Sequence, residues 1–378
     1  MVSLLSSGWP AAHMLDRTAG RLVRAWMGRP FSRRSRRRAL ICFSPNRISY
    51  SQVYPFLHYA SDFAQALDVE FRCLSIDALL AGEDIGYRDV DHVLVQSWFD
   101  VDGTALAALL RRLRDTYPEA RISFLDSYAH NDLRLGRVIE PFVSDYVKKS
   151  LFRDRSLFLR AWRGTTNLTE YYSDLYGITA EPVDWHVPQA LLGKLHLAPN
   201  FFTDARFIRL IEQGPPIGGR IRDIDIHARL GKHGSGWYKE MRLASLAPLK
   251  AMRDLTIVAE GNVPLPAFMA ELRRSKLCFS PFGYGELCWR DVEAFCTGSV
   301  LVKPDMSHLE TAPDLYEPWV TYLPIAWDFS DLEAVVRSAL ADEAGMARMA
   351  ETAHGRIVDY IREKRFVKDM GFLFAPGT

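Results

Sequence analysis

The sequence predicts an α/β protein built from two doubly wound domains that face a central cleft. Its 378 residues exceed one ordinary core, since a single domain usually spans about 100 to 200 residues. From residue 39 onward, short apolar runs alternate with longer amphipathic segments, a pattern typical of parallel strands covered by helices. The alternation stops at the Pro- and Gly-rich stretch 213–219 and then restarts, which places the domain boundary there.

The first domain is expected over residues 39–212. It opens with a short, continuous apolar run at 39–43, which predicts a buried strand. We predict its further elements as strands 69–76, 91–98 and 120–126 and helices 50–67 and 104–116. Residues 127–200 hold more helix and loop, without a clear period.

The second domain is expected over residues 213–345. We predict its elements as strands 223–228, 255–259, 276–280, 300–303 and 320–323 and helices 238–250, 264–274, 289–297 and 331–341, followed by a last helix at 346–368. In such folds, ligands bind beyond the carboxyl ends of the strands. The functional site is therefore expected between the two sheets.

Residues 1–38 form a basic segment that stands apart from both domains. It contains nine arginines and one acidic residue, Asp16. Arg17, Arg21 and Arg24 have helical spacing with apolar residues between them, which suits a helix lying on an anionic membrane surface. The alternative is a disordered leader. A cleavable secretion signal is disfavoured, because the charges follow the short apolar stretch 2–5 instead of preceding it.

Composition narrows the class of protein. The 47 Lys and Arg residues nearly balance the 46 Asp and Glu residues, so a net charge of +1 gives no overall attraction to nucleic acid. The five cysteines are scattered without a Cys-x-x-Cys pair, which indicates thiols in a reducing compartment. No apolar run approaches the ~20 residues that cross a bilayer. We expect a cytoplasmic protein, peripheral on the inner face of the cell membrane if residues 1–38 bind lipid.

A glycine-rich turn joins a strand to a helix within residues 279–298. Glycines leave room for a ligand beside the backbone, and the N–H groups of the turn and of the helix start can bind phosphate. Arg290 can add a bidentate contact to a diphosphate, and Glu293, on the same helix face, can accept both ribose hydroxyls. The alternative is a surface ion pair between Arg290 and Glu293. The donor-binding candidates of this unit are Gly283, Tyr284, Gly285, Glu286, Arg290 and Glu293.

This unit resembles the donor-binding segment of GT-B glycosyltransferases, above all the exostosin-like and family 1-like groups, which have two Rossmann-like domains. The resemblance rests on the glycine turn, Arg290-x-x-Glu293-Ala294 and Gly298, and with the strand and loop that follow it covers roughly residues 220–340. It implies a nucleotide-sugar donor whose ribose binds Glu293 and whose phosphates bind Arg290. It also implies that residues 346–378 cross back onto the first domain.

One spacing departs from the pattern of that family. Six residues separate Glu286 from Glu293, one fewer than in many retaining members. Retaining and inverting chemistry therefore both stay open. Three more donor contacts are candidates: Arg229 and Lys232 follow the strand 223–228, and His308 follows a later strand end. The alternatives are a solvated loop for the two basic residues and a structural role for the histidine.

An inverting transfer needs a base beside the acceptor hydroxyl, commonly an Asp, Glu or His of the first domain. The candidates follow the predicted strand 120–126: Asp126, His130 and Asp132, with Asp100 as a weaker fourth. The alternative for Asp126 and Asp132 is capping of the next helix. Lys148 and Lys149 either meet an acidic acceptor or lie on a solvated helix face.

Signals for metals and cofactors are weak. Residues 223–225 spell Asp-x-Asp, but their alternation places both side chains on one face at the start of a strand, and we assign no metal ligand. Walker-type and early Gly-x-Gly-x-x-Gly motifs are missing from the sequence, which disfavours ATPases and dinucleotide oxidoreductases. No cofactor is expected beyond the donor, which is a substrate.

Together these observations predict a metal-independent glycosyltransferase. It would move a sugar from a nucleotide diphosphate sugar to a hydroxyl of a glycan or glycolipid, and family analogy suggests bacterial surface polysaccharide biosynthesis. Two alternatives come from other classes. One is a non-catalytic glycan- or nucleotide-sugar-binding protein, and the other is a nucleotide-sugar epimerase of the same architecture.

Overall fold

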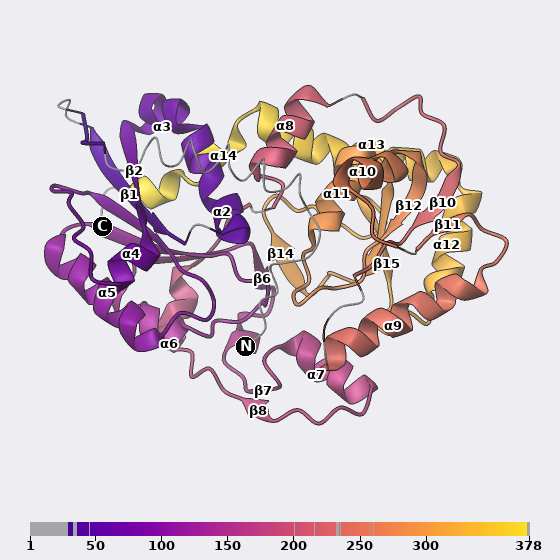
Figure 1. The fold of residues 1–378 in the computed structure, drawn as a ribbon, viewed down its shortest axis with the longest axis horizontal. Coiled ribbons are helices and arrows are strands. Elements are labelled where there is room, and N and C mark those ends of the chain that lie inside the picture. The colour runs from indigo at the N-terminus through magenta and orange to yellow at the C-terminus, as the bar shows by residue number, and fades with distance from the viewer. Residues whose placement is uncertain are drawn as a thin grey trace.

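Two α/β domains lie side by side in the computed structural model (Figure 1). Each has its own parallel sheet with helices on its faces, which confirms the predicted class of two doubly wound domains. The structure describes residues 29–32, 36–44, 46–199, 201–214, 216–231, 234, 236–259 and 261–375. The proposed membrane-surface helix within residues 1–28 and the candidate Lys232 lie outside the described residues.

The N-terminal domain has a six-stranded parallel sheet in the order β2-β1-β3-β4-β5-β9. The central strands are almost wholly buried, as expected when helices cover both faces. The strands are β1 Arg37–Phe43, β2 Val69–Ser75, β3 His92–Gln96, β4 Arg121–Asp126, β5 Asp145–Lys148 and β9 Leu195–Leu197. The helices are α2 Arg47–His58, α3 Ala60–Leu67, α4 Ile76–Leu80, α5 Gly103–Thr116 and α6 Gly136–Ile139.

Two features of this domain differ from the sequence-based expectation. The single helix predicted at 50–67 is two helices, because Tyr59, with φ −95° and ψ 21°, leaves helical geometry between α2 and α3. The stretch 127–200, which has no clear period, contributes two further parallel strands, β5 and β9. Both are short, and a strand of three or four residues is too brief to show a period.

The C-terminal domain has a five-stranded parallel sheet in the order β11-β10-β12-β13-β15. Its strands are β10 Ile224–His227, β11 Ile257–Val258, β12 Ser275–Phe279, β13 Val300–Pro304 and β15 Tyr322–Ile325. The helices are α9 Gly236–Ala251, α10 Leu265–Arg274, α11 Trp289–Thr297 and α12 Leu332–Ala341. The alternation read from the sequence therefore matches the order of the sheet strands and helices in this domain, but it missed β14 Leu309–Thr311, a short strand outside the five-stranded sheet.

The chain end runs from the second domain to the first (Figure 1). After α13 Glu343–Arg362 come α14 Arg365–Asp369 and a short 3-10 helix, η4 Gly371–Phe374. Phe366 packs edge-on against Phe56, with ring centroids 4.9 Å apart, and Phe374 packs in the same manner against Phe63. Residues 366–374 thus share the apolar core of the N-terminal domain.

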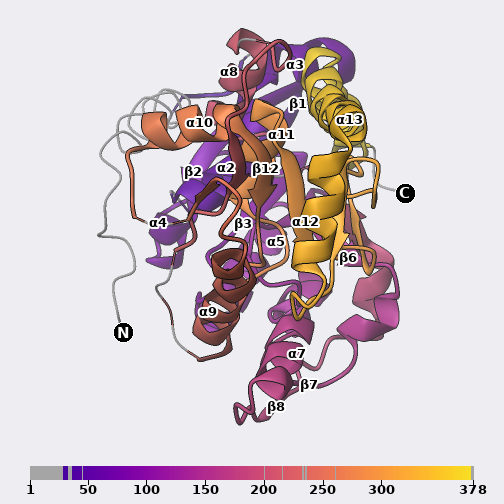
Figure 2. The ribbon, with the colours of Figure 1, turned by 90° about the vertical axis from the view of Figure 1, so that its right-hand side faces the viewer.

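A second connection between the domains comes from the segment that follows β5. Strand β6 Ser150–Phe152 pairs antiparallel with β14 Leu309–Thr311 of the C-terminal domain. Helix α7 Asn167–Leu175 then packs against α9, so both views show this segment under the C-terminal domain (Figures 1 and 2). Between β6 and α7 lie η2 Arg155–Phe158 and β7 Trp162–Arg163, and after α7 the chain returns to β9 through β8 Pro182–Val183 and η3 Gln189–Lys194. The remaining small elements are η1 Glu140–Phe142, which precedes β5, and α8 Ala205–Gln213, which follows β9.

None of the helices in the described part of the chain is long and apolar enough to cross a membrane.

Candidate functional site

The candidate site lies where the loop after β4 meets the glycine turn after β12. A side chain built on Gly285 would place its Cβ 1.7 Å from the carbonyl oxygen of Ala129, so only glycine permits this approach. The rings of His130 and Tyr284 lie beside the same contact, with centroids 6.1 Å apart. Two loops predicted to carry function, one from each domain, are therefore brought together.

A buried network around Asp291 fixes the glycine turn. The Asp291 carboxylate accepts hydrogen bonds from Ser280 Oγ (2.5 Å) and from Tyr316 OH (2.9 Å), and Lys303 Nζ lies 3.1 Å away. Asp291 also accepts from the Cys288 backbone N–H at 3.0 Å, which caps the start of α11. Because the charge pair is fully buried and hydrogen-bonded, it holds the turn and the helix in one relative orientation.

Glu286 is a buried carboxylate at the junction, with 1% of its surface exposed. Asn167, at the start of α7, donates from Nδ2 to Glu286 Oε1 at 3.0 Å, and His308 Nε2 lies 3.5 Å from the same oxygen. Burial opposes ionisation, but the contacts with His308 and Asn167 outweigh it and hold the pKa of Glu286 below its usual value. The turn therefore presents a carboxylate, which groups from both domains orient.

Arg290 and Arg229 adopt different roles in the C-terminal domain. The Arg229 guanidinium makes a bidentate pair with Glu271, at 2.6 and 2.8 Å, so its charge is already engaged. Arg290 donates from one terminal nitrogen to the Arg229 carbonyl oxygen at 2.6 Å, while its buried Nε has no hydrogen-bond partner. Of the two predicted phosphate contacts, Arg290 is the one with donor capacity to spare.

Glu293 does not pair with Arg290, contrary to the surface-pair alternative. Its buried carboxylate lies 3.0 Å from Arg206 Nη2 of α8, the helix that leads into the interdomain linker. The Arg206 guanidinium lies over the ring of Phe207, which itself stacks on Trp289, the first residue of α11. A nucleotide ribose at Glu293 would thus share this carboxylate with Arg206.

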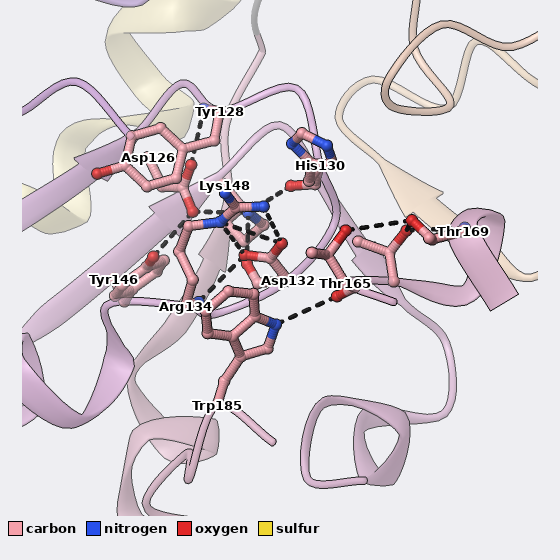
Figure 3. Close-up of polar contacts among 11 residues, drawn as sticks. Asp126, Tyr128, His130, Asp132, Arg134, Tyr146, Lys148, Thr165, Thr169 and Trp185 are labelled. Carbon is pink, nitrogen blue, oxygen red and sulfur yellow. Dashed lines mark hydrogen bonds and ion pairs between the residues drawn. The ribbon is translucent and has the colours of Figure 1, made fainter. Parts of the chain in front are cut away.

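The carboxylates among the predicted bases are both occupied (Figure 3). Asp126 accepts from Lys148 Nζ (2.6 Å), from Tyr146 OH (2.8 Å) and from a backbone N–H (2.8 Å). Asp132 makes a bidentate pair with Arg134, whose guanidinium lies between the rings of Phe99 and Trp185. Neither aspartate caps a helix, so the contacts match neither the capping alternative nor a free base.

His130 is the remaining member of the predicted trio. Its imidazole makes no hydrogen bond to another described residue, and Figure 3 shows the ring at the outer end of the loop. Burial lowers the pKa of His130 to about 4, and the positive charge of Arg134 acts in the same direction. The imidazole is therefore neutral near pH 7, and one ring nitrogen has a lone pair that can accept a hydrogen bond. Asp100, the weaker candidate, is exposed.

The two lysines after Val147 do not lie on a solvated helix face. Lys148 ends β5 and Lys149 precedes β6, and both side chains are buried. Lys148 is neutralised by Asp126, whereas Lys149 Nζ has no hydrogen-bond partner. The sequence analysis missed this difference. Two adjacent lysines usually indicate a solvent-exposed surface, and the strand end that buries them was not predicted.

Two other groups complete the description of the predicted sites. The acidic pair at 223–225 is structural: Asp223 pairs with Arg274, and Asp225 pairs with Lys276 and accepts from the Thr256 N–H. Within the described ranges no cluster of His, Cys, Asp or Glu side chains could hold a metal ion.

The sequence analysis did not identify two residues of the site, Asn167 and Arg206. Each lies in a segment without a motif and reaches the site only through the fold.

No protein-family model matches the chain, and no curated protein sequence matches it. Solved structures match it in three dimensions. An α-glucosyltransferase in complex with UDP and a 13-mer DNA containing an HMU base matches with a TM-score of 0.50 at 10% identity, over 90% of this chain and 100% of that chain. A glycosyltransferase from Rickettsia africae matches with a TM-score of 0.50 at 9% identity, over 90% and 98%. These likenesses confirm the predicted GT-B fold.

Proposed function

We propose that the protein is a glycosyltransferase that moves a sugar from a nucleotide diphosphate sugar to a hydroxyl of a glycan or glycolipid. The observation that carries this proposal is the position of Glu286: a buried carboxylate on a glycine turn, at the start of a helix, held by Asn167 of one domain and His308 of the other. A GT-B fold brings donor and acceptor together between its domains. Glu286 lies at that junction.

The residues around the turn divide the work of transfer. The bond from the anomeric carbon to the diphosphate breaks and a bond to the acceptor oxygen forms, so negative charge develops on the leaving diphosphate. Arg290 and the first N–H groups of α11 are placed to stabilise that charge. Glu286 and His308 orient sugar hydroxyls, and Glu293 binds the ribose alongside Arg206.

His130 is the predicted base that best fits the acceptor side. Its neutral imidazole has a ring nitrogen with a free lone pair. His130 also lies on the loop that touches the glycine turn. Domain contacts around Gly285 would keep water from the reacting carbon, which suppresses hydrolysis of the donor. We place the reaction in bacterial surface polysaccharide assembly, on the cytoplasmic side of the membrane and without a metal ion, from family analogy alone.

The test is incubation of the purified chain with UDP-, GDP-, ADP- and dTDP-sugars, with and without cell-envelope glycan and with EDTA throughout. UDP-sugars come first, because a solved structure of the same fold binds UDP. Nucleotide release that needs acceptor supports transfer. Isomerisation of the donor without acceptor would make the chain an epimerase, and binding without turnover would make it a binding protein.

A further inference from the structure

Lys149 is a buried lysine that forms no ion pair with a carboxylate among the described residues. It joins β5 to β6, only 4% of its surface is exposed, and its Nζ has no hydrogen-bond partner among the described residues. Its Nζ lies over the face of the Phe201 ring, 4.5 Å from the ring centroid. Burial lowers the pKa of Lys149 to about 8, and the neighbouring charge of Lys148 adds to this. A buried ammonium without an anion is costly, so such a group usually pairs with an anion or gives up its proton.

Lys149 lies near the start of α11 at the domain junction. Phe201, whose ring it touches, stacks on Trp289 with centroids 4.6 Å apart, and Trp289 is the first residue of that helix. The charges of Glu286 and Cys288, on the turn before α11, also act on the ammonium. The first N–H groups of a helix have no partner within the helix and attract anions. Lys149 and this helix start therefore lie close together, with the Phe201 ring in contact with both.

Further positive charge surrounds this helix start. The guanidiniums of Arg47 and Arg206 lie 4.7 and 5.7 Å from the Trp289 ring, and both come from the N-terminal domain. Arg290 of the C-terminal domain keeps a buried Nε without a partner. The two nearby carboxylates are already engaged, Glu293 by Arg206 and Glu286 by His308 and Asn167. Among the described residues, the junction thus keeps buried donors without a hydrogen-bond partner on both domains, Lys149 Nζ on one and Arg290 Nε on the other.

We propose that Lys149 is the N-terminal domain's part of an oxyanion site at the start of α11, and that the diphosphate of the sugar donor occupies it. This inference rests on the proposed function. The donor would then contact both domains through its phosphates, with Lys149 on one side and Arg290 on the other. A site assembled in this manner is complete only while the two loops are in contact, so donor binding favours the closed junction.

The test compares Lys149→Met with Lys149→Arg and with Lys250→Met, a matched change at an exposed lysine in the last turn of α9. Calorimetry measures binding of inorganic pyrophosphate and of UDP, GDP and ADP at pH 7. We expect Lys149→Met to weaken pyrophosphate and the preferred nucleotide about 10- to 100-fold, because a charged hydrogen bond is lost. Lys149→Arg should retain most of the affinity, and the Lys250 variant all of it.

Thermal unfolding without ligand gives an independent readout. Methionine fits the apolar surroundings without a buried charge, so we expect Lys149→Met to raise Tm by about 2 to 5 °C. If Lys149 served only to stabilise the fold, Lys149→Met would instead lower Tm. If Lys149→Met is more stable than wild type but binds the ligand more weakly, Lys149 serves ligand binding at the expense of stability.

The outcomes separate this inference from the proposed function. Equal binding of a nucleotide by wild type and Lys149→Met would overturn the role of Lys149 and leave glycosyl transfer standing. Lys149-dependent binding of pyrophosphate, with no binding of any nucleotide, would support the oxyanion site and remove the nucleotide-sugar donor. No binding of either probe by the wild type would overturn both.

Discussion

The loop after β4 and the turn after β12 meet at one contact, yet they use their charges differently. In the N-terminal loop each carboxylate has its own cation, Asp126 with Lys148 and Asp132 with Arg134. At the C-terminal turn, Glu286 lies against Asn167 and His308 with no Lys or Arg partner among the described residues, and in the same part of the chain Arg290 keeps a buried donor without a partner. The residue types are alike in the two regions. What separates a structural charge from a functional one is whether the fold has already satisfied it.

The largest expected effect tests the structural side of this comparison. Asp126→Asn removes the counter-charge of Lys148, which is 2% exposed, and leaves a buried ammonium. Breaking one partner of a buried pair usually costs about 3 to 5 kcal/mol of folding free energy. We expect a loss of that size in urea unfolding. The exposed Asp100→Asn is the matched control and should change stability by less than about 0.5 kcal/mol.

The double variant Asp126→Asn with Lys148→Met should recover part of the lost stability, because no buried charge then remains. An Asp126→Asn protein of normal stability that no longer transfers sugar would reverse the assignment. It would return Asp126 to the list of bases.

Replacement of Glu286 tests the functional side. Glu286→Gln keeps the shape of the side chain and removes its charge, so Asn167 and His308 lose the carboxylate that they orient. We expect kcat for acceptor-dependent nucleotide release to fall about 10²- to 10³-fold, which is the usual loss when one preorganised electrostatic contact is removed. Stability should change little, in contrast to Asp126→Asn.

Glu333→Gln, at an exposed ion pair on α12, serves as the control for the loss of one carboxylate. A Glu286→Gln enzyme with full activity would show that the turn only supports the fold.

The same contrast explains how far the sequence could be read. Periodicity and the 213–219 breaker predict the C-terminal sheet, four of the six strands of the N-terminal sheet and the order of almost every long helix, because these signals are local. The glycine turn and Arg290 are also local, and the motif that contains them ends in a helix with the predicted limits, 289–297. Local patterns therefore sufficed for most of the fold and for one half of the site.

The other half depends on contacts that no local pattern encodes. Lys149 becomes a buried cation only because β5 joins the sheet and β6 crosses to pair with β14. Asn167 reaches Glu286 over 119 positions of sequence, and Arg206 reaches Glu293 through the packing of α8. Neutralisation of Asp126 likewise needs Lys148, which the sequence places beside Lys149 without any sign that their surroundings differ. Charge availability is a tertiary property, and residue type alone does not reveal it.

Replacement of Arg290 should have a smaller effect than replacement of Asp126 or Glu286, and the effect should be on nucleotide affinity. Arg290→Ala removes the guanidinium beside the helix start while the buried Asp291 network continues to hold the turn. Nucleotide affinity should weaken by about 1.5 to 3 kcal/mol, as for the loss of a charged hydrogen bond. Calorimetry with UDP or GDP measures it. Arg337→Ala, at a surface ion pair, should leave affinity unchanged; unchanged affinity in a folded Arg290→Ala protein would remove Arg290 from the site.

The smallest expected effect concerns His130, where the two regions touch. Its pKa is lowered to about 4 in the folded protein by burial, against an ordinary value of about 6.5. Between these values the unfolded chain binds more protons at this position than the folded protein, so stability falls as the pH falls. From pH 7.5 to 5.5, wild type should lose about 1 kcal/mol more than His130→Gln in urea unfolding. Other buried histidines contribute equally to both proteins and cancel in the difference. Equal pH slopes would mean that the imidazole titrates in the folded protein as it does in the unfolded chain, which would contradict the burial of this ring at the junction.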